Sequence, residues 1–121
     1  MTTTTSKGRA GEDKAVAHLK SRGFTIVARN YRTNGGEIDI VAQKDKLLVF
    51  VEVKARSSEA HGAAVYAVTP AKQRKIVLAA TQFIKEKSPE FDSIRFDVIC
   101  VLQGVNIMHV FNAFRPKRTT L

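Results

Sequence analysis

Charged residues interrupt two apolar stretches in the first half of the sequence. Asp39 lies within the stretch 38–41, and Glu52 and Lys54 lie within the stretch 48–54. An unpaired charge in apolar surroundings is strongly disfavoured, so these side chains need water, a partner or a metal ion. Carboxylate oxygens are the ligands that Mg²⁺ prefers in proteins. The pattern therefore indicates two carboxylates that hold a divalent cation beside a lysine.

The two stretches are predicted to pair as a β-hairpin whose connection is residues 43–46. In that register Asp39 faces Phe50. Because side chains alternate along a strand, Asp39 shares one face with Glu52 and Lys54, and the two acids are diagonal neighbours about 7–8 Å apart. A slip of one residue would send them to opposite faces. The alternative is that Glu52 and Lys54 are an exposed pair at a strand end.

The composition limits the class of protein. A chain of 121 residues is long enough for one compact domain, so we expect a single domain, 1–121, with flexible ends at 1–7 and 116–121. Twenty Lys and Arg against eleven Asp and Glu give a net charge of +9. This excess favours an anionic partner, nucleic acid first and an anionic membrane surface second; the alternative is a soluble protein that is simply basic.

Cysteine content and hydropathy indicate the compartment. Cys100 is the one cysteine, so an internal disulfide is excluded, and a buried thiol in a reducing cytoplasm is expected. No apolar run approaches the roughly 20 residues that span a bilayer. We therefore expect a cytoplasmic protein without a membrane partner.

The expected secondary structure is α-β-β-β-α-β-β. Hydrophobic periodicity and the positions of Gly and Pro predict helices at 7–22 and 69–87 and strands at 24–31, 35–41, 48–54, 94–102 and 105–111. One mixed α/β sheet of about five strands, flanked by two helices, is the simplest architecture.

The first helix carries an acid that could join the site. Glu12, Val16 and Leu19 follow the spacing of one helical face, so Glu12 occupies a position that is normally apolar. The alternative is a helix-start acid that interacts with the macrodipole.

The second helix begins with an unfavourable arrangement of charge. Lys72, Arg74 and Lys75 crowd its first turns, where the macrodipole disfavours cations. A bound phosphate would relieve the conflict; the alternative is a solvated basic face. Two further polar residues lie in apolar strands: Asp97 is expected to pair with a neighbouring arginine, and His109 to be structural or exposed rather than a metal ligand.

Four motifs resemble a known family. Gly11-Glu12 and the stretches 29–32, 36–39 and 51–54 are similar to those of the YraN-like family of small bacterial proteins. The resemblance extends from about Gly8 to Arg115. Glu12, Asp39 and the Glu-Val-Lys run at 52–54 also resemble the core of the PD-(D/E)XK nucleases, which include restriction endonucleases and archaeal Holliday junction resolvases. The chain departs from that pattern because isoleucine, not proline, precedes Asp39.

The resemblance implies a restriction-endonuclease-like fold and an endonuclease that uses Mg²⁺ or Mn²⁺ to hydrolyse structured or branched DNA. The implied catalytic residues are Glu12, Asp39, Glu52 and Lys54. Asp39, Glu52 and the carbonyl of Val53 would hold the metal, with Glu12 joining directly or through water. Lys54 would hold the attacking water or stabilise developing charge. Glu37 either supports these ligands or is exposed. The expected nucleic-acid contacts are Arg29, Arg32, Arg56, Lys72, Gln73, Arg74 and Lys75.

Resolvases act as two-fold dimers, so the resemblance also implies a homodimer. Two other functions fit the same residues. One is a nucleic-acid-binding module that keeps the nuclease fold without cutting, and the other is an adaptor whose basic face binds an acidic protein.

Overall fold

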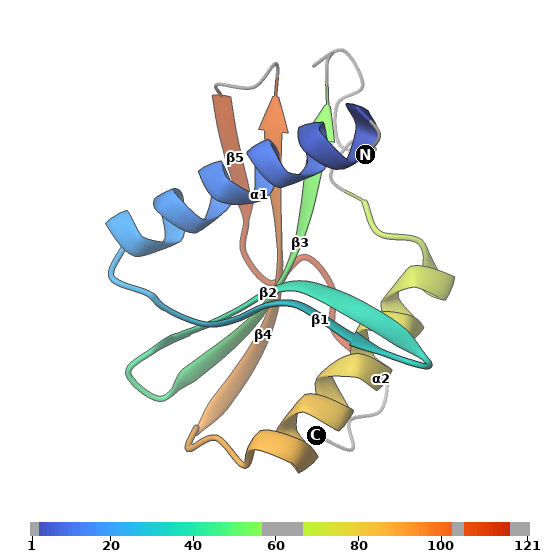
Figure 1. Ribbon diagram of the computed structural model, residues 1–121. Helices are drawn as coiled ribbons and strands as arrows, with labels where there is room; N and C mark the ends of the chain where they lie inside the picture. The colour runs from blue at the N-terminus through green and yellow to red at the C-terminus, as the bar shows by residue number, and fades with distance from the viewer. Residues whose placement is uncertain (1–2, 57–66, 103–105, 117–121) are drawn as a thin grey trace.

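A computed structural model describes residues 3–56, 67–102 and 106–116 of the chain (Figure 1). The elements follow the expected order: α1 (Thr3–Ser21), β1 (Thr25–Thr33), β2 (Gly36–Lys44), β3 (Leu47–Arg56), α2 (Pro70–Lys87), β4 (Ser93–Leu102) and β5 (Asn106–Val110). Helix α1 begins four residues earlier than expected. The ends 1–2 and 117–121 and most of the expected connection 55–67 lie outside the described residues.

The five strands form one mixed sheet in the order β1-β2-β3-β4-β5. Strands β1, β2 and β3 pair antiparallel in succession, β3 and β4 pair parallel, and β5 returns antiparallel to β4. Parallel neighbours need a crossover connection, and the segment that contains α2 provides it. The predicted α/β sheet flanked by two helices is confirmed.

Two apolar cores lie on opposite faces of the sheet, each under one helix. Leu19 of α1 packs in a cluster with Val49 and Val51 of β3. Phe83 of α2 packs in a second cluster with Phe50. Successive side chains of β3 point to opposite faces, so its uninterrupted apolar run is buried by both helices. Cys100 is buried and free, as expected.

The hairpin of β2 and β3 differs from the predicted register. Its turn is Asp45-Lys46 alone, and Lys44 pairs with Leu47. Asp45 has a left-handed backbone (φ 54°), which lets two residues reverse the chain, so the predicted connection of 43–46 is wrong by two residues. A shift of two keeps every side chain on its face.

Two glycines allow close approaches that position the site. A Cβ at Gly11 of α1 would lie 3.2 Å from the Cβ of Ala55, and a Cβ at Gly36 would lie 2.4 Å from the carbonyl oxygen of Lys75. The second distance excludes any side chain there, so the start of β2 lies directly against α2. Within the described residues, neither helix has the length and apolar character needed to cross a membrane.

Candidate active site

Asp39 and Glu52 come together where the pairing of β2 with β3 ends. The pairing extends from Lys44 and Leu47 to Ile40 and Val51, so the next position along both strands brings Asp39 beside Glu52. The Asp39 carboxylate accepts a hydrogen bond from the backbone N–H of Val53, with 2.8 Å between Oδ2 and N. This bond fixes the carboxylate against β3. The two acids share a face as predicted, as direct neighbours instead of the predicted diagonal ones.

The charges of this pair are incompletely compensated. The pKa of Asp39 is raised to about 7, first by burial and next by the negative charge of Glu52. A hydrogen bond between the two side chains and the charge of Glu37 act in the same direction, and only the Val53 N–H opposes them. A cation bound beside the two carboxyl groups would favour their ionised forms.

Lys72 supplies one nearby cation. Its Nζ lies 3.7 Å from Oε2 of Glu52, whose side chain is only 13% exposed. Thr69 caps α2 by accepting a bond from the Lys72 N–H, and Pro70 is the first helical residue, an arrangement that favours the start of a helix. The first turn of α2 thus brings Lys72 toward the acids.

Lys54 lies on the same face of β3 as Glu52, two residues further along. Its Nζ donates a hydrogen bond to the backbone carbonyl of Ala67, in the segment that leads into α2. Burial, followed by the positive charge of Arg56, lowers the pKa of Lys54, while Glu52 opposes the shift. The structure therefore places Lys54 beside the acids, with its ammonium bound to the backbone.

Glu12 reaches the site from α1. Its side chain is 16% exposed and lies 3.7 Å from the guanidinium of Arg29, and its Oε1 accepts a hydrogen bond from Nδ2 of Asn30 at 3.1 Å. Burial raises the pKa of Glu12, and the charge of Asp39 raises it further. Glu12 is therefore in the electrostatic range of the acid pair, as its helical position predicted.

Asn30 is a residue of the site that the sequence analysis did not single out. Its backbone is left-handed (φ 52°) within strand β1, a conformation that asparagine tolerates better than most residues. The motif 29–32, which contains Asn30, was the sequence signal that could have identified it. Arg29 forms its shortest bond with Asp13, at 2.8 Å, and its expected contact with nucleic acid stays a prediction.

The donor set of this site suits a hard divalent cation. The oxygens of Asp39 and Glu52 are the ligand type that Mg²⁺ and Mn²⁺ prefer. Within the described residues, no group of three or more His, Cys, Asp or Glu side chains is arranged to hold a metal ion. Glu12 is thus not part of a preformed set of metal ligands. The N–H of Val53 donates to Asp39, and the carbonyl of Val53 stays a predicted ligand.

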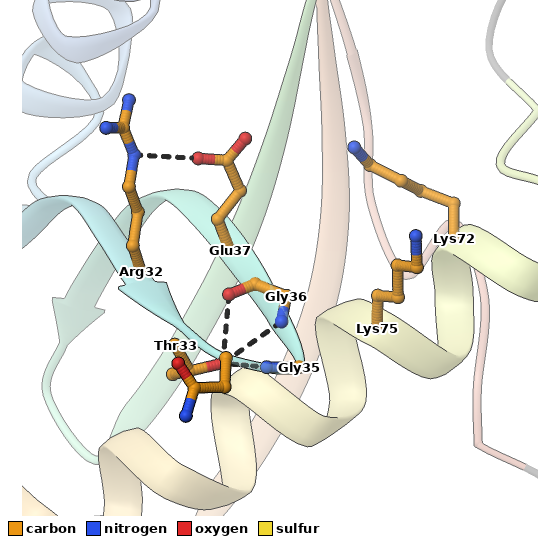
Figure 2. A pocket seen from close by; sticks show the side chains of 8 residues that line it. Arg32, Thr33, Gly35, Gly36, Glu37, Lys72 and Lys75 are labelled. Atoms are coloured by element: carbon orange, nitrogen blue, oxygen red, sulfur yellow. Dashed lines mark hydrogen bonds and ion pairs between the residues drawn. The ribbon is translucent and has the colours of Figure 1, made fainter.

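Some of the predicted nucleic-acid contacts gather beside the acids. Figure 2 shows Arg32, Lys72 and Lys75 around one hollow, with Arg32 paired to Glu37 at 3.1 Å. The remaining ones lie elsewhere. Gln73 donates to the carbonyl of Val68, Arg74 lines a separate, mainly apolar groove, and Arg56 is exposed at the end of β3.

A second polar cluster surrounds Asp97 on β4. Its carboxylate accepts two bonds from Arg95, one from Nε2 of His109 and one from the N–H of Asn112, all at 2.8 Å. Nδ1 of His109 lies 3.1 Å from Nε2 of His18 on α1. The arginine partner and the structural role of His109 agree with the sequence interpretation. No sequence pattern predicts the role of His18, since the two histidines are 91 positions apart.

Comparison with known proteins places the chain among uncharacterised relatives. A family model described as "Uncharacterised protein family UPF0102" matches residues 11–101. A UPF0102 protein of Sulfurihydrogenibium is 46% identical over 91% of this chain and 95% of its own length. UPF0102 proteins of Ralstonia pickettii and Desulforapulum autotrophicum are 44% and 48% identical over 92% and 85% of this chain, and over 91% and 85% of their own lengths. UPF0102 is the YraN-like family, so the membership expected from the motifs is confirmed.

Proposed function

We propose that this chain, which belongs to the uncharacterised protein family UPF0102, is a metal-dependent endonuclease that hydrolyses phosphodiester bonds in structured or branched DNA. The observation that carries the proposal is the meeting of Asp39 and Glu52, incompletely compensated, beside Lys54 and at the edge of a basic surface. The net charge of +9 favours the same class of substrate.

Asp39 and Glu52 would hold Mg²⁺ or Mn²⁺, with Glu12 joining directly or through water. Bound there, the ion would neutralise phosphoryl oxygens and lower the pKa of a water molecule. The bond from the Val53 N–H fixes the orientation of Asp39, and Asn30 fixes that of Glu12. The chain therefore orients its own ligands through groups outside the ligand set.

The two lysines have distinct roles in this proposal. Lys54 leaves the carbonyl of Ala67 and holds the attacking water or stabilises the negative charge that develops on the phosphorus centre. Lys72, whose Nζ lies 3.7 Å from Glu52, would contact the phosphate. A two-fold dimer would present two such sites to the symmetric strands of a junction.

The test is cleavage of labelled junction, flap and single-stranded DNA with Mg²⁺ or Mn²⁺. We expect the wild type to cut at least one branched substrate and chelator to stop it. Asp39→Asn and Lys54→Ala should each lower the rate at least about 100-fold. Asp92→Asn and Lys85→Ala are the matched controls, since both residues are exposed.

Thermal melting must show that each variant is folded before its activity is interpreted. If Asp39→Asn and Lys54→Ala cut as fast as the two controls, the nuclease proposal is wrong. Cleavage that persists in chelator would contradict the metal requirement separately.

A second function is favoured by two observations. Lys54 is bound to the backbone of Ala67, and the described residues hold no preformed three-ligand metal group. A binding module that does not cut fits both facts. It predicts salt-sensitive DNA binding that neither Lys54→Ala nor chelator changes, with no products from any substrate.

A further inference from the structure

A polar hollow adjoins the acid pair between the β1–β2 turn and the first half of α2. Figure 2 shows its side chains, and its volume is about 340 Å³. Two of its residues connect it to the candidate active site. Lys72 lies 3.7 Å from Glu52, and the charge of Glu37 raises the pKa of Asp39. A ligand in the hollow would therefore lie next to whatever binds the acids.

The hollow has an excess of positive charge. Arg32, Lys72 and Lys75 line it against the single carboxylate of Glu37. The pair of Arg32 with Glu37 has side chains that are 74% and 44% exposed, so it holds Arg32 weakly. Within the described residues, no ion pair involves Lys75. Its ammonium is therefore the cation most available to a ligand.

The shape and chemistry of the hollow fit a phosphate better than a base. No aromatic residue is among those that line it, so a base would find no stacking platform. The N–H groups of Gly35 and Gly36 both donate to Oγ1 of Thr33 at 3.1 Å, so they do not offer hydrogen bonds to base edges. The three cationic side chains, Arg32, Lys72 and Lys75, outnumber the one neutral side-chain amide, that of Asn34, and contacts of cations with phosphate oxygens position DNA without reading its sequence.

We propose that this hollow is a subsite for a DNA backbone phosphate adjacent to the one that is cut, with Lys75 as its principal contact. The inference rests on the proposed function for the position of that phosphate relative to the cut. The subsite provides a second contact with the DNA backbone and no preference for base sequence. A substrate is then selected by the spacing of its phosphates.

The first experiment measures binding in chelator, so that nothing is cut. A fluorescently labelled four-way junction is titrated with wild type, Lys75→Gln and Lys85→Gln over a range of salt concentrations, and anisotropy is recorded. Lys85 is the matched control, because it is an exposed lysine near the other end of α2. We expect Lys75→Gln to reduce the slope of log K against log salt by about 0.9, the value for one phosphate contact.

The second experiment finds the phosphate. Each phosphate around the branch point is replaced in turn by a neutral methylphosphonate, and binding is measured for wild type and Lys75→Gln. We expect one position whose neutralisation weakens wild type but not Lys75→Gln, since the partner is already lost. Thermal melting with inorganic phosphate separates a free anion from DNA. If phosphate raises the melting temperature of wild type but not of Lys75→Gln, while no methylphosphonate position distinguishes the two proteins, a free anion is the ligand and the DNA subsite is overturned.

The outcomes separate this inference from the nuclease proposal. If Lys75→Gln and Lys85→Gln give the same slope, the subsite is wrong, while cleavage by the wild type would still support a nuclease. If the slopes differ and no substrate is cut, the subsite stands and the nuclease is wrong. If the wild type binds no DNA at low salt, both are wrong.

Discussion

Asp97 and Asp39 are two acids on strands of one sheet that the protein treats in opposite ways. The side chain of Asp97 is fully buried, and burial by itself raises the pKa of a carboxyl group. The bonds from His109, Arg95 and the Asn112 N–H outweigh that effect and hold the pKa of Asp97 below its usual value. Asp39 accepts one N–H bond and faces Glu52, and its pKa is raised to about 7.

Burial acts in the same direction on both carboxyl groups, and what differs is the set of donors that opposes it: Arg95, His109 and the Asn112 N–H at Asp97, and the Val53 N–H at Asp39. An acid that serves stability is surrounded by donors, because an uncompensated buried charge costs several kcal/mol. Repulsion between neighbouring carboxylates destabilises the folded protein, and a cation bound between them would remove that repulsion. Strongly shifted pKa values of the second kind cluster at functional sites.

Among these substitutions, we expect removal of the Asp97 carboxylate to change the stability of the protein most. Asp97→Ala leaves Arg95 and His109 without their shared partner. Breaking a buried pair in this way typically costs about 3–5 kcal/mol, so we expect the free energy of unfolding in urea to fall by that amount. The matched control is Asp92→Ala, an exposed acid, which should change it by less than about 0.5 kcal/mol.

Equal stabilities for Asp97→Ala and Asp92→Ala would mean that the Asp97 cluster does not contribute to the free energy of unfolding. Asp97 would then not be an acid that stabilises the fold, in contrast to Asp39.

The second effect is the opposite behaviour at Asp39. Asp39→Asn keeps an oxygen that can accept from the Val53 N–H and removes the repulsion with Glu52. We expect its stability at pH 7 to stay within about 1 kcal/mol of wild type, on the more stable side. A ligand that binds only the folded state raises the melting temperature, so Mn²⁺ should stabilise wild type and leave Asp39→Asn unchanged.

Asp92→Asn controls for nonspecific binding of Mn²⁺ to surface acids. A melting temperature that rises equally in all three proteins would show that Asp39 does not hold the ion, whatever the stability of the variant.

The site could be predicted as far as it depends on local patterns. Alternation along two strands was enough to bring Asp39, Glu52 and Lys54 to one face, because a register error of two residues preserves the face. Helical periodicity was enough to direct Glu12 inward. These inferences need only the period of each element.

The rest depended on contacts between distant segments. The two-residue turn at Asp45 could not be read from a polar run of four residues, so the distance between the acids was overestimated. Lys54 binds Ala67, and His18 meets His109 across 91 positions, and no spacing rule encodes either contact. Asn30 was visible only as part of a motif, since its left-handed backbone is set by the local course of β1.

His18 is expected to contribute a smaller change, which appears in the pH dependence of stability. Burial, then the charges of His109 and Arg22, lowers the pKa of His18. Below the usual histidine pKa of about 6.5 the unfolded chain takes up a proton that the folded protein accepts less readily, so stability falls as pH falls through that range. The contribution of Asp97 persists in this range and is lost only as pH falls through its own lowered pKa. The two losses therefore occur in separate pH windows.

His18→Gln isolates the first window. We expect the melting temperature of wild type to drop more between pH 7 and pH 5 than that of His18→Gln, by an amount smaller than the effect of Asp97→Ala. Both proteins keep Asp39 and Glu12, whose raised pKa values act in the opposite direction, so their contributions cancel in the comparison. Parallel curves for the two proteins would show that the contact between His18 and His109 does not couple folding to pH.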